Sequence, residues 1–370
     1  MKYSYAILFL LGLSTLFQFC TSGKNALKQG DYYQAVSLAV NRLRQNPDHK
    51  KSKEVLKTSY QFAIDYLEQS AQNQLNSNAN FKWKTAVQSY EQINSLYEQI
   101  RTSPGALKII PNPVNKYKEL TEVKGKAAEE SYEAGIQFML KNTREDAKRA
   151  YFLFVDANSL SPGYRESIEM MEQAKFNATV KVVVEPTFAN YNNWNFEPAV
   201  FGTNVNQFVK FYTPREAEDA NLTRIDHFVK VSINGYNEGR PATSNRTDNF
   251  TDSVKVSEKT VNGQKIPVYE KITAKMTTYE KVITARGSIV LYIRDANSGA
   301  DLRNADIVTD TRWSDRWATC SGDVRAIPEA TRKLCGTKEP YMQRDFLITR
   351  TKRELDTKLS NALSSFYSNY

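Results

Sequence analysis

Histidine and cysteine are scarce in this chain of 370 residues, which contains 2 histidines and 3 cysteines. His49 and His227 fall in different predicted domains, and a Ser-His-Asp or Cys-His arrangement would have to use one of them. His49 comes at an expected helix start and His227 begins an expected strand, so structural roles explain both. The chain has no CxxC or HExxH spacing, Gly-x-Ser-x-Gly elbow, Walker loop or Rossmann glycine run. We therefore predict no catalytic residue, no metal site and no cofactor, and we expect a protein that is not an enzyme.

A block of basic residues is also absent, although the net charge is +9 at pH 7. Lysine and arginine are interspersed with aspartate and glutamate along the whole chain. This pattern is typical of a solvated mixed surface and predicts no nucleic-acid partner, while attraction to anionic lipid or glycolipid headgroups stays open. Hydrophobic residues at 41% and charged residues at 25% are ordinary for globular proteins, and the length suffices for two or three domains.

Charged residues are missing from the segment 3–19, which follows Lys2. The centre of this segment, residues 6–11, is wholly apolar, and charge returns only at Lys24. The layout is typical of a secretory signal peptide, and the segment is marginal in length for a membrane-spanning helix. We predict that residues 1–19 are a signal peptide and that the protein is exported.

Cys20 stands directly after this apolar segment, and its placement resembles a bacterial lipoprotein signal. The resemblance implies that Cys20 is acylated, for example with palmitate, and becomes the first residue of a lipid-anchored mature chain. The family pattern has a small residue before the cysteine and leucine near the third position before it, whereas Phe19 and Phe17 stand here. Thr21, rather than aspartate, follows the cysteine, and residues 21–25 contain no acidic residue. This pattern resembles that of lipoproteins that are sorted to the outer membrane and face the periplasm. A plain secreted protein, or an uncleaved anchor, is the alternative.

Two cysteines, Cys320 and Cys335, remain once Cys20 is assigned to lipid. Exported proteins meet oxidising conditions, in which such a pair tends to join. We predict a disulfide bond between them, which would hold an expected short helix at 326–334 near the sheet edge. Two buried free thiols are the alternative.

The periodicity of the hydrophobic residues changes near residue 177. Residues 21–176 have a helical and proline-poor pattern, residues 177–319 have a strand-like pattern, and a helical tail closes the chain. We predict an α+β protein. Its N-terminal helical domain, 20–176, precedes a mostly antiparallel sheet domain, 177–370, which ends in a long helix.

Residues in the helical domain follow a repeat spacing at two places. The first place comprises Gly23, Gly30, Asp31, Tyr32, Ala35, Leu43 and Pro47, and the second comprises Ala150, Phe154, Ala157 and Pro162 after a helix over 132–139. These residues resemble a degenerate tetratricopeptide repeat, in which small residues lie where two antiparallel helices touch. Arg42 departs from the alanine of that pattern, and an irregular helical bundle is the alternative. Between the two places lies a helical stripe that is expected in the core, formed by Trp83, Ala86, Tyr90, Ile93 and Tyr97.

The second domain has a predicted series of elements. They are a strand at 180–184, a short helix at 205–212, a strand at 227–233, an exposed polar loop at 234–252, a hairpin of 254–259 with the residues from 265 onward across Asn262 and Gly263, a strand at 283–294, a return strand at 305–313 and a helix at 345–367. One face of the last helix is predicted to lie on the sheet, with Ile348, Leu355, Leu359, Leu363 and Phe366. Its basic residues are expected to face solvent: Arg350, Lys352, Arg353 and Lys358.

The order of these elements resembles the periplasmic α/β domain of curli-secretion-type envelope lipoproteins. The phrase that carries this resemblance is residues 289–299, an aliphatic strand followed by Asp295 and, three and four residues later, Ser298 and Gly299. Such hairpins are common, so the resemblance implies a fold and no function.

Aromatic residues gather between asparagine-rich segments at Phe188, Tyr191, Trp194 and Phe196. Exposed aromatic rings beside amides can stack on sugars or contact a protein partner. These four residues are therefore candidates for ligand binding. The alternative is a segment that packs onto the sheet.

Ser253 is a candidate for O-glycosylation. The triplet of Asp252, Ser253 and Val254 resembles the Asp-(Ser/Thr)-aliphatic acceptor of Bacteroidota-type exported proteins. It ends the expected polar loop, where a transferase would reach it. The alternative is that Ser253 simply starts the next strand.

Three functions are compared on these grounds. The first is a periplasm-facing lipoprotein scaffold or adaptor, which binds an envelope protein partner through its helical repeats. The second is a binder of carbohydrate or glycolipid that uses the β domain and its aromatic segment. The third is a hydrolase without a recognisable motif. We expect the first.

Overall fold

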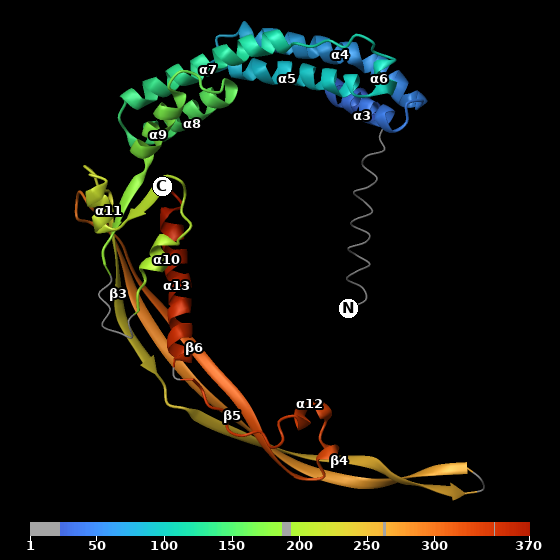
Figure 1. Ribbon diagram of the computed structural model, residues 1–370, viewed down its shortest axis with the longest axis vertical. Helices are drawn as coiled ribbons and strands as arrows, with labels where there is room; N and C mark the ends of the chain where they lie inside the picture. Colours follow the sequence, from blue (N-terminus) through green and yellow to red (C-terminus); the bar gives the residue numbers. More distant parts are fainter. Residues whose placement is uncertain (1–22, 187–193, 262–263, 344) are drawn as a thin grey trace. The chain divides into compact units, whose positions relative to one another are not determined.

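The protein is described by a computed structural model that covers residues 23–186, 194–261, 264–343 and 345–370 (Figure 1). The chain divides into two compact units, Met1–Ala178 and Thr179–Tyr370. The first unit is helical, and the second contains a mostly antiparallel sheet and a long C-terminal helix, which confirms the predicted α+β class. The last helix of the first unit continues through Ala178, two residues past the expected end of that domain.

The helical unit contains helices that pack mainly on their neighbours in sequence. They are α2 (Lys24–Lys28), α3 (Tyr32–Gln45), α4 (Lys50–Leu75), α5 (Lys82–Arg101), α6 (Pro104–Leu107), α7 (Tyr117–Leu140), α8 (Arg144–Leu160) and α9 (Ser167–Ala178). One hydrophobic core runs from α2 to α7, and a second one joins α7, α8 and α9. Sequential packing of this kind lets each hairpin bury the apolar face of the next. A standard tetratricopeptide repeat has 34 residues and contains two helices. α4 has 26 residues, so it is too long to be one helix of a standard repeat.

Small residues lie at the close contacts between these helices. A Cβ atom on Gly23 would lie 2.4 Å from the carbonyl oxygen of Ala35, so only glycine fits against α3 there. On α7, a Cβ atom on Gly135 would lie 2.7 Å from a ring carbon of Phe154. Ala150 and Ala157 of α8 are fully buried beside that ring. The two places that the repeat spacing marks are therefore places of close helix contact.

The sheet of the second unit combines parallel and antiparallel pairs. Its strands are β1 (Val180–Val184), β2 (Val209–Tyr212), β3 (His227–Glu238), β4 (Ala242–Val261), β5 (Gln264–Asp295) and β6 (Asp301–Gly322). The order is β2-β1-β3-β5-β4, with β6 on the other edge of β5. β1 is parallel to β2 and β3, and every pair that includes β5 is antiparallel.

Three of the expected elements differ from the structure. The predicted helix at 205–212 is wrong, because residues 209–212 form β2 beside β1. The predicted loop at 234–252 is wrong as well, because β3 extends to Glu238 and β4 begins at Ala242. The polar sequence of β4 reflects an edge strand with no buried residue, on which only Phe250 and Val254 pack partly against a core. The return strand, β6, is also longer than expected and spans Asp301–Gly322.

α13 (Phe346–Tyr367) lies along one face of the sheet (Figure 1). Its apolar side packs against β1, β3 and β5, as the spacing of Leu355, Leu359 and Leu363 predicts. Gly287 of β5 permits this close approach, because a Cβ atom there would lie 2.5 Å from Cγ2 of Thr351. Two short helices, α10 (Glu197–Phe201) and α11 (Pro214–Asp219), complete this end of the unit.

The covered side of β5 changes along its length. Its buried residues are odd-numbered from Ile283 to Ile293, where α13 packs, but they are Ile272, Ala274 and Met276 at the other end. There η2 (Val324–Ala326) and α12 (Glu329–Arg332) cover the even-numbered side. β6 pairs with β5 only as far as Ala274, and β4 and β5 continue as a two-stranded ribbon. We call residues 252–261 and 264–272 of this ribbon the β arm (Figure 1).

Candidate functional site

A groove with a volume of about 480 Å³ crosses α3, α4 and α5 in the helical unit. Its lining is aromatic and polar, and it includes Tyr32, Tyr33, Tyr66, Ser70, Gln88 and Gln92. Asp31 positions the first two rings, because its carboxylate accepts a hydrogen bond from the backbone N–H of Gln34 at 3.0 Å and begins α3 there. The ring of Tyr32 stacks on Phe62 of α4 with 5.4 Å between centroids. We call this site the aromatic groove.

Two aromatic residues are exposed here, unlike those of the core: Tyr66 lines the aromatic groove, and Phe62 lies beside it, stacked on Tyr32. Phe62 is 56% exposed and Tyr66 is 64% exposed, and they lie four residues apart on the same side of α4. The sequence analysis did not identify this pair. Their positions could have indicated the exposure, because they lie outside the register of the buried residues Ala63, Ile64 and Leu67.

A second hollow of about 700 Å³ lies further along the helical unit, on α5, α7 and the segment before α9. Its lining includes Trp83, Lys126, Glu129, Tyr132, Glu133 and Arg165. The cations already contact groups in the hollow: Lys126 lies 5.2 Å from the centre of the Trp83 ring, and Arg165 lies 3.6 Å from the Glu129 carboxylate. The hydroxyl of Tyr132 donates to Glu166 at 3.1 Å, and burial together with this bond raises its pKa. The hollow therefore offers mixed charge and aromatic surface.

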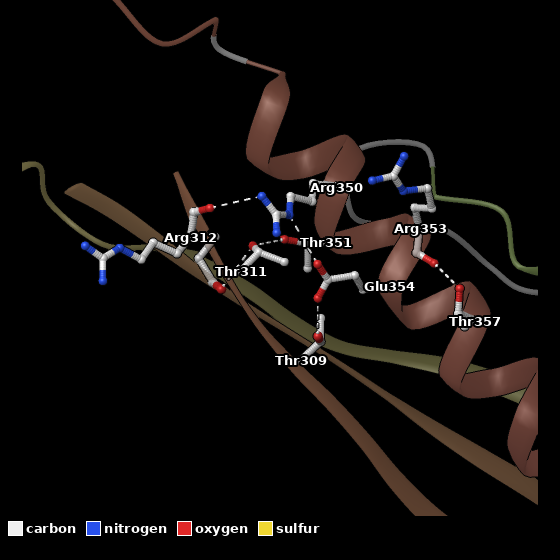
Figure 2. A network of polar contacts seen from close by, with 9 residues as sticks. Thr309, Thr311, Arg312, Arg350, Thr351, Arg353, Glu354 and Thr357 are labelled. Atoms are coloured by element: carbon white, nitrogen blue, oxygen red, sulfur yellow. Dashed lines mark hydrogen bonds and ion pairs between the residues drawn. The ribbon is translucent and has the colours of Figure 1, made fainter. Parts of the chain in front are cut away.

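A polar network joins α13 to the sheet (Figure 2). Thr309 Oγ1 donates to Glu354 Oε2 at 2.9 Å, and the hydroxyls of Thr311 and Thr351 lie 2.7 Å apart. Arg350 donates to Glu354 Oε1 at 3.2 Å. Burial opposes the ionisation of Glu354, but the contacts from Thr309 and Arg350 outweigh it and lower the pKa of its carboxyl.

Of the four basic residues of α13 that are expected to face solvent, Arg353 and Lys358 are exposed, and Arg350 and Lys352 are half-buried. Arg350 donates to the backbone carbonyl of Arg312 at 3.2 Å, and Lys358 donates to the carbonyl of Val308 at 2.6 Å. Lys352 forms an ion pair with Asp356 at 2.7 Å. Arg350 and Lys358 thus connect α13 to β6, whereas the Lys352–Asp356 pair lies within the helix, so the network is a structural one.

Both histidines have structural partners. The Nδ1 atom of His49 accepts from the backbone N–H of Ser52 and begins α4. His227 is 4% exposed, and its Nδ1 atom lies 3.3 Å from the hydroxyl of Tyr367. Asp226, the neighbour of His227, accepts from the backbone N–H of Lys181 at 2.9 Å. These contacts fix a helix start and the junction of β1, β3 and α13.

The four candidate aromatics do not form an exposed site where the structure describes them. Trp194 is 2% exposed and Phe196 is fully buried, and both belong to the core under α13. The two rings contact edge to face with 6.0 Å between centroids. Trp194 and Phe196 therefore pack onto the sheet, which was the alternative, and the prediction that they contact a ligand is wrong. Phe188 and Tyr191 lie outside the described residues.

The disulfide between Cys320 and Cys335 is confirmed, with its sulfur atoms 2.01 Å apart. It connects the end of β6 to the segment after α12 and belongs to the core that η2 covers. Cys20 lies outside the described residues. Ser253 is exposed, but it lies within β4, so the loop in which it was expected is a strand. The turn residues Asn262 and Gly263 also lie outside the described part, between the paired residues Val261 and Gln264.

Among the described residues, no group of three or more histidine, cysteine, aspartate or glutamate side chains could hold a metal ion. None of the described helices is long and apolar enough to cross a membrane.

Comparison with known proteins identifies no family for this chain. No family model matches it, and no curated protein matches it.

Proposed function

We propose that this protein is a scaffold or adaptor of the bacterial envelope that binds a partner protein through its helical unit. In this proposal, Cys20 carries lipid and anchors the chain in the outer membrane, with the folded units facing the periplasm. The helical hairpins are degenerate tetratricopeptide-like repeats, and the protein binds its partner without transforming it. The resemblances at Cys20 and in the repeats support these parts of the proposal.

The aromatic groove is the observation that carries the binding function. Aromatic side chains are enriched in protein interfaces, and those that the free protein leaves exposed are available to a partner. Phe62 and Tyr66 meet that description, and Tyr32 stacks beside them. Gln88 and Gln92 add amide groups that can both donate and accept hydrogen bonds with a partner's backbone. The groove therefore fits an extended peptide segment with apolar side chains.

The charge of the aromatic groove indicates which kind of peptide segment it can bind. Among the described residues that line it, Asp31 is the one that carries charge, and its carboxylate caps α3. A highly charged segment would gain little there. We infer that the bound segment is neutral and that aromatic and aliphatic side chains supply most of its contact area.

The test uses the native protein, purified gently from its envelope with its associated proteins. Phe62→Ala and Tyr66→Ala should each reduce the recovery of the specific partner, because interface residues of this kind contribute about 2 kcal/mol or more, roughly thirtyfold in affinity. Tyr341→Ala is the matched control, because Tyr341 is 87% exposed and belongs to the second unit. A partner that is recovered equally with the Phe62→Ala, Tyr66→Ala double variant does not bind in the aromatic groove.

A further inference from the structure

β1 lies at a point in the sheet where the order of the strands reverses. β2 and β3 are both parallel to β1 and flank it on opposite edges. The two connections lie on opposite sides of the sheet, since α10 packs with α13 and α11 packs against β1 and β2 on the other side (Figure 1). In open α/β sheets, ligands bind outside the carboxyl ends of the strands at such a switch point. The end of β1 is therefore the place in this sheet where the topology favours a ligand site.

A hollow with a volume of about 350 Å³ lies at the end of β1, on the side of the sheet opposite α13. Phe228 of β3 lies opposite Arg294 of β5 in the ladder, and two residues further along Lys230 lies opposite Tyr292. The odd-numbered neighbours of these residues form the core under α13, so the even-numbered side chains share the other side. The residues that line the hollow are Glu185, Phe228, Lys230, Ser232, Tyr292 and Arg294.

The size and part of the lining suit a small organic molecule. Ligand sites have volumes of about 300–1,000 Å³ and are lined largely by apolar and aromatic side chains. Phe228 is half-buried and packs with Val183 and Ala217 into the small core below α11. Tyr292 is half-buried as well. The two rings thus offer an apolar surface that the protein itself leaves partly open.

Two cations at the hollow retain donors that the protein does not use. Arg294 donates to Asp301 at 3.2 Å through Nε, and its two terminal nitrogens donate to no described residue. Lys230 lies 3.8 Å from Glu185. Both of these side chains are about half exposed, at 51% and 44%, so their ion pair is weak. A ligand at the hollow can therefore accept hydrogen bonds from both cations.

The charge of the hollow favours an anionic ligand. Two cations and one carboxylate line it, which leaves an excess of positive charge. The hydroxyls of Ser232 and Tyr292 form no hydrogen bond with a described residue, so they add two neutral donors. A guanidinium group binds a carboxylate or a phosphate through two parallel hydrogen bonds, which are about twice as strong as neutral ones.

We propose that this hollow binds a small organic anion, in which a carboxylate or a phosphate is attached to a flat apolar body. The anionic group accepts hydrogen bonds from the terminal nitrogens of Arg294 and from Lys230. The body packs on the rings of Phe228 and Tyr292. The site belongs to the sheet unit and shares no residue with the aromatic groove, so it does not depend on the proposed binding of a partner protein.

The first test titrates residues 21–370, which contain every described residue, with small probes followed by protein NMR. The probes are benzoate, phenyl phosphate, benzyl alcohol and inorganic phosphate. At least one of the two aromatic anions should shift the amide signals of Lys230 and Ser232 in a saturable way, and the tighter of the two identifies the anionic group. Benzyl alcohol should bind at least about tenfold more weakly, because it lacks the charge. Inorganic phosphate should also bind more weakly, because it has no ring to pack on Phe228.

Three results of this titration overturn the proposal. They are the lack of a saturable shift with both aromatic anions, equal binding of benzyl alcohol, and equal binding of inorganic phosphate. The first means that the hollow is not a ligand site. The second removes the role of the cations, and the third removes the role of the rings.

A pair of matched variants tests the location of the site. Arg294→Gln should weaken the binding of the aromatic anion at least about tenfold, because a charge-assisted contact is lost. Arg286→Gln is the control: Arg286 lies on the same side of β5, is 67% exposed and pairs with Asp310, but does not line the hollow. Both changes remove one positive charge and one exposed ion pair, so their effects on folding should be equally small. Equal affinity in the two variants overturns the assigned site.

An acidic side chain of a partner protein is the alternative occupant of the hollow. If Arg294→Gln reduces the recovery of the envelope partner while neither aromatic anion binds to wild type, the hollow belongs to a protein interface and the proposal is overturned. Tyr66→Ala should leave anion binding unchanged, because Tyr66 belongs to the helical unit. Partner binding and anion binding therefore succeed or fail separately in the same preparations.

Discussion

Gly125 and Gly135 lie on the same helix, α7, but differ in what surrounds them. Nothing lies within 4 Å of a Cβ atom built on Gly125, whereas on Gly135 the added atom would lie 2.7 Å from the Phe154 ring. Alanine is favoured over glycine in a helix interior by roughly 1 kcal/mol, and overpacking a core costs about 1–3 kcal/mol. Gly125→Ala should therefore stabilise the protein, and Gly135→Ala should destabilise it. Urea unfolding followed by circular dichroism measures both, and equal effects would mean that Phe154 moves aside freely.

The membrane anchor depends on one residue, Cys20, in this proposal. A single acyl chain gives marginal membrane binding, while two or more hold a protein firmly. Cys20→Ser should therefore release the protein into the soluble periplasmic or culture fraction. Immunoblots of fractionated cells provide the measurement. A variant that stays with the membrane through a wash without detergent would show that the anchor lies elsewhere.

Glu354 gives the attachment of α13 a pH dependence. The pKa of its carboxyl is lowered in the folded protein, so its ionised form stabilises the fold above the unfolded pKa of about 4.3. That stabilisation is lost as the pH falls from about 5 through the folded pKa. Glu354→Gln should therefore lose less stability than wild type between pH 7 and acid. Urea unfolding at each pH compares the two, and Glu329→Gln on the exposed surface of α12 is the control.

At the scale of elements, the disulfide determines whether the η2–α12 segment stays on the sheet. Cys320 and Cys335 close a short loop with a sequence separation of 15, and chain entropy gives such a loop about 3 kcal/mol of stabilisation. The double variant Cys320→Ala, Cys335→Ala should lose roughly this free energy of unfolding. Hydrogen exchange should rise at Ile272 and Met276, which the segment covers. Mass spectrometry of unreduced peptides that finds both thiols free would contradict the bond itself.

The sequence predicts some of these elements well because their burial is one-sided. α13 was predicted almost to the residue, since Leu355, Leu359 and Leu363 recur on a single covered face. β4 was missed because none of its residues is buried, so its sequence is mostly polar like that of a loop. β2 was missed because Val209 is buried in the core under α13 and Tyr212 in a separate core with Ala217. Periodicity reports burial, so it indicates secondary structure best where one face alone is covered.

The aromatic groove could not be predicted for a related reason. Aromatic residues between polar segments were the predicted ligand contacts, but Trp194 and Phe196 among them are core residues of the sheet unit. Phe62 and Tyr66 fall outside the register of the buried residues of α4, but exposed aromatic residues on a helix do not by themselves indicate a binding site. Only the packing of α3, α4 and α5 shows that a groove lies beside this pair.

At the scale of the whole molecule, the chain contains two units that each have their own cores. The helical cores draw on residues up to Ala174, and the sheet cores draw on residues from Val180 onward. Fragments 21–178 and 179–370 should therefore fold separately, the first as mostly helix and the second as strand with one long helix. Circular dichroism and cooperative urea unfolding of each fragment test this. An unfolded helical fragment would mean that its hairpins need the sheet unit to complete their cores.

The same two fragments decide which unit carries function. If the aromatic groove binds the envelope partner, the partner should associate with fragment 21–178 and lose that association in Tyr66→Ala. Pull-downs with the two fragments measure this association. A partner that follows only fragment 179–370 would exclude the helical scaffold and favour a binding protein that uses its sheet, since the aromatic groove would then be absent from the fragment that binds.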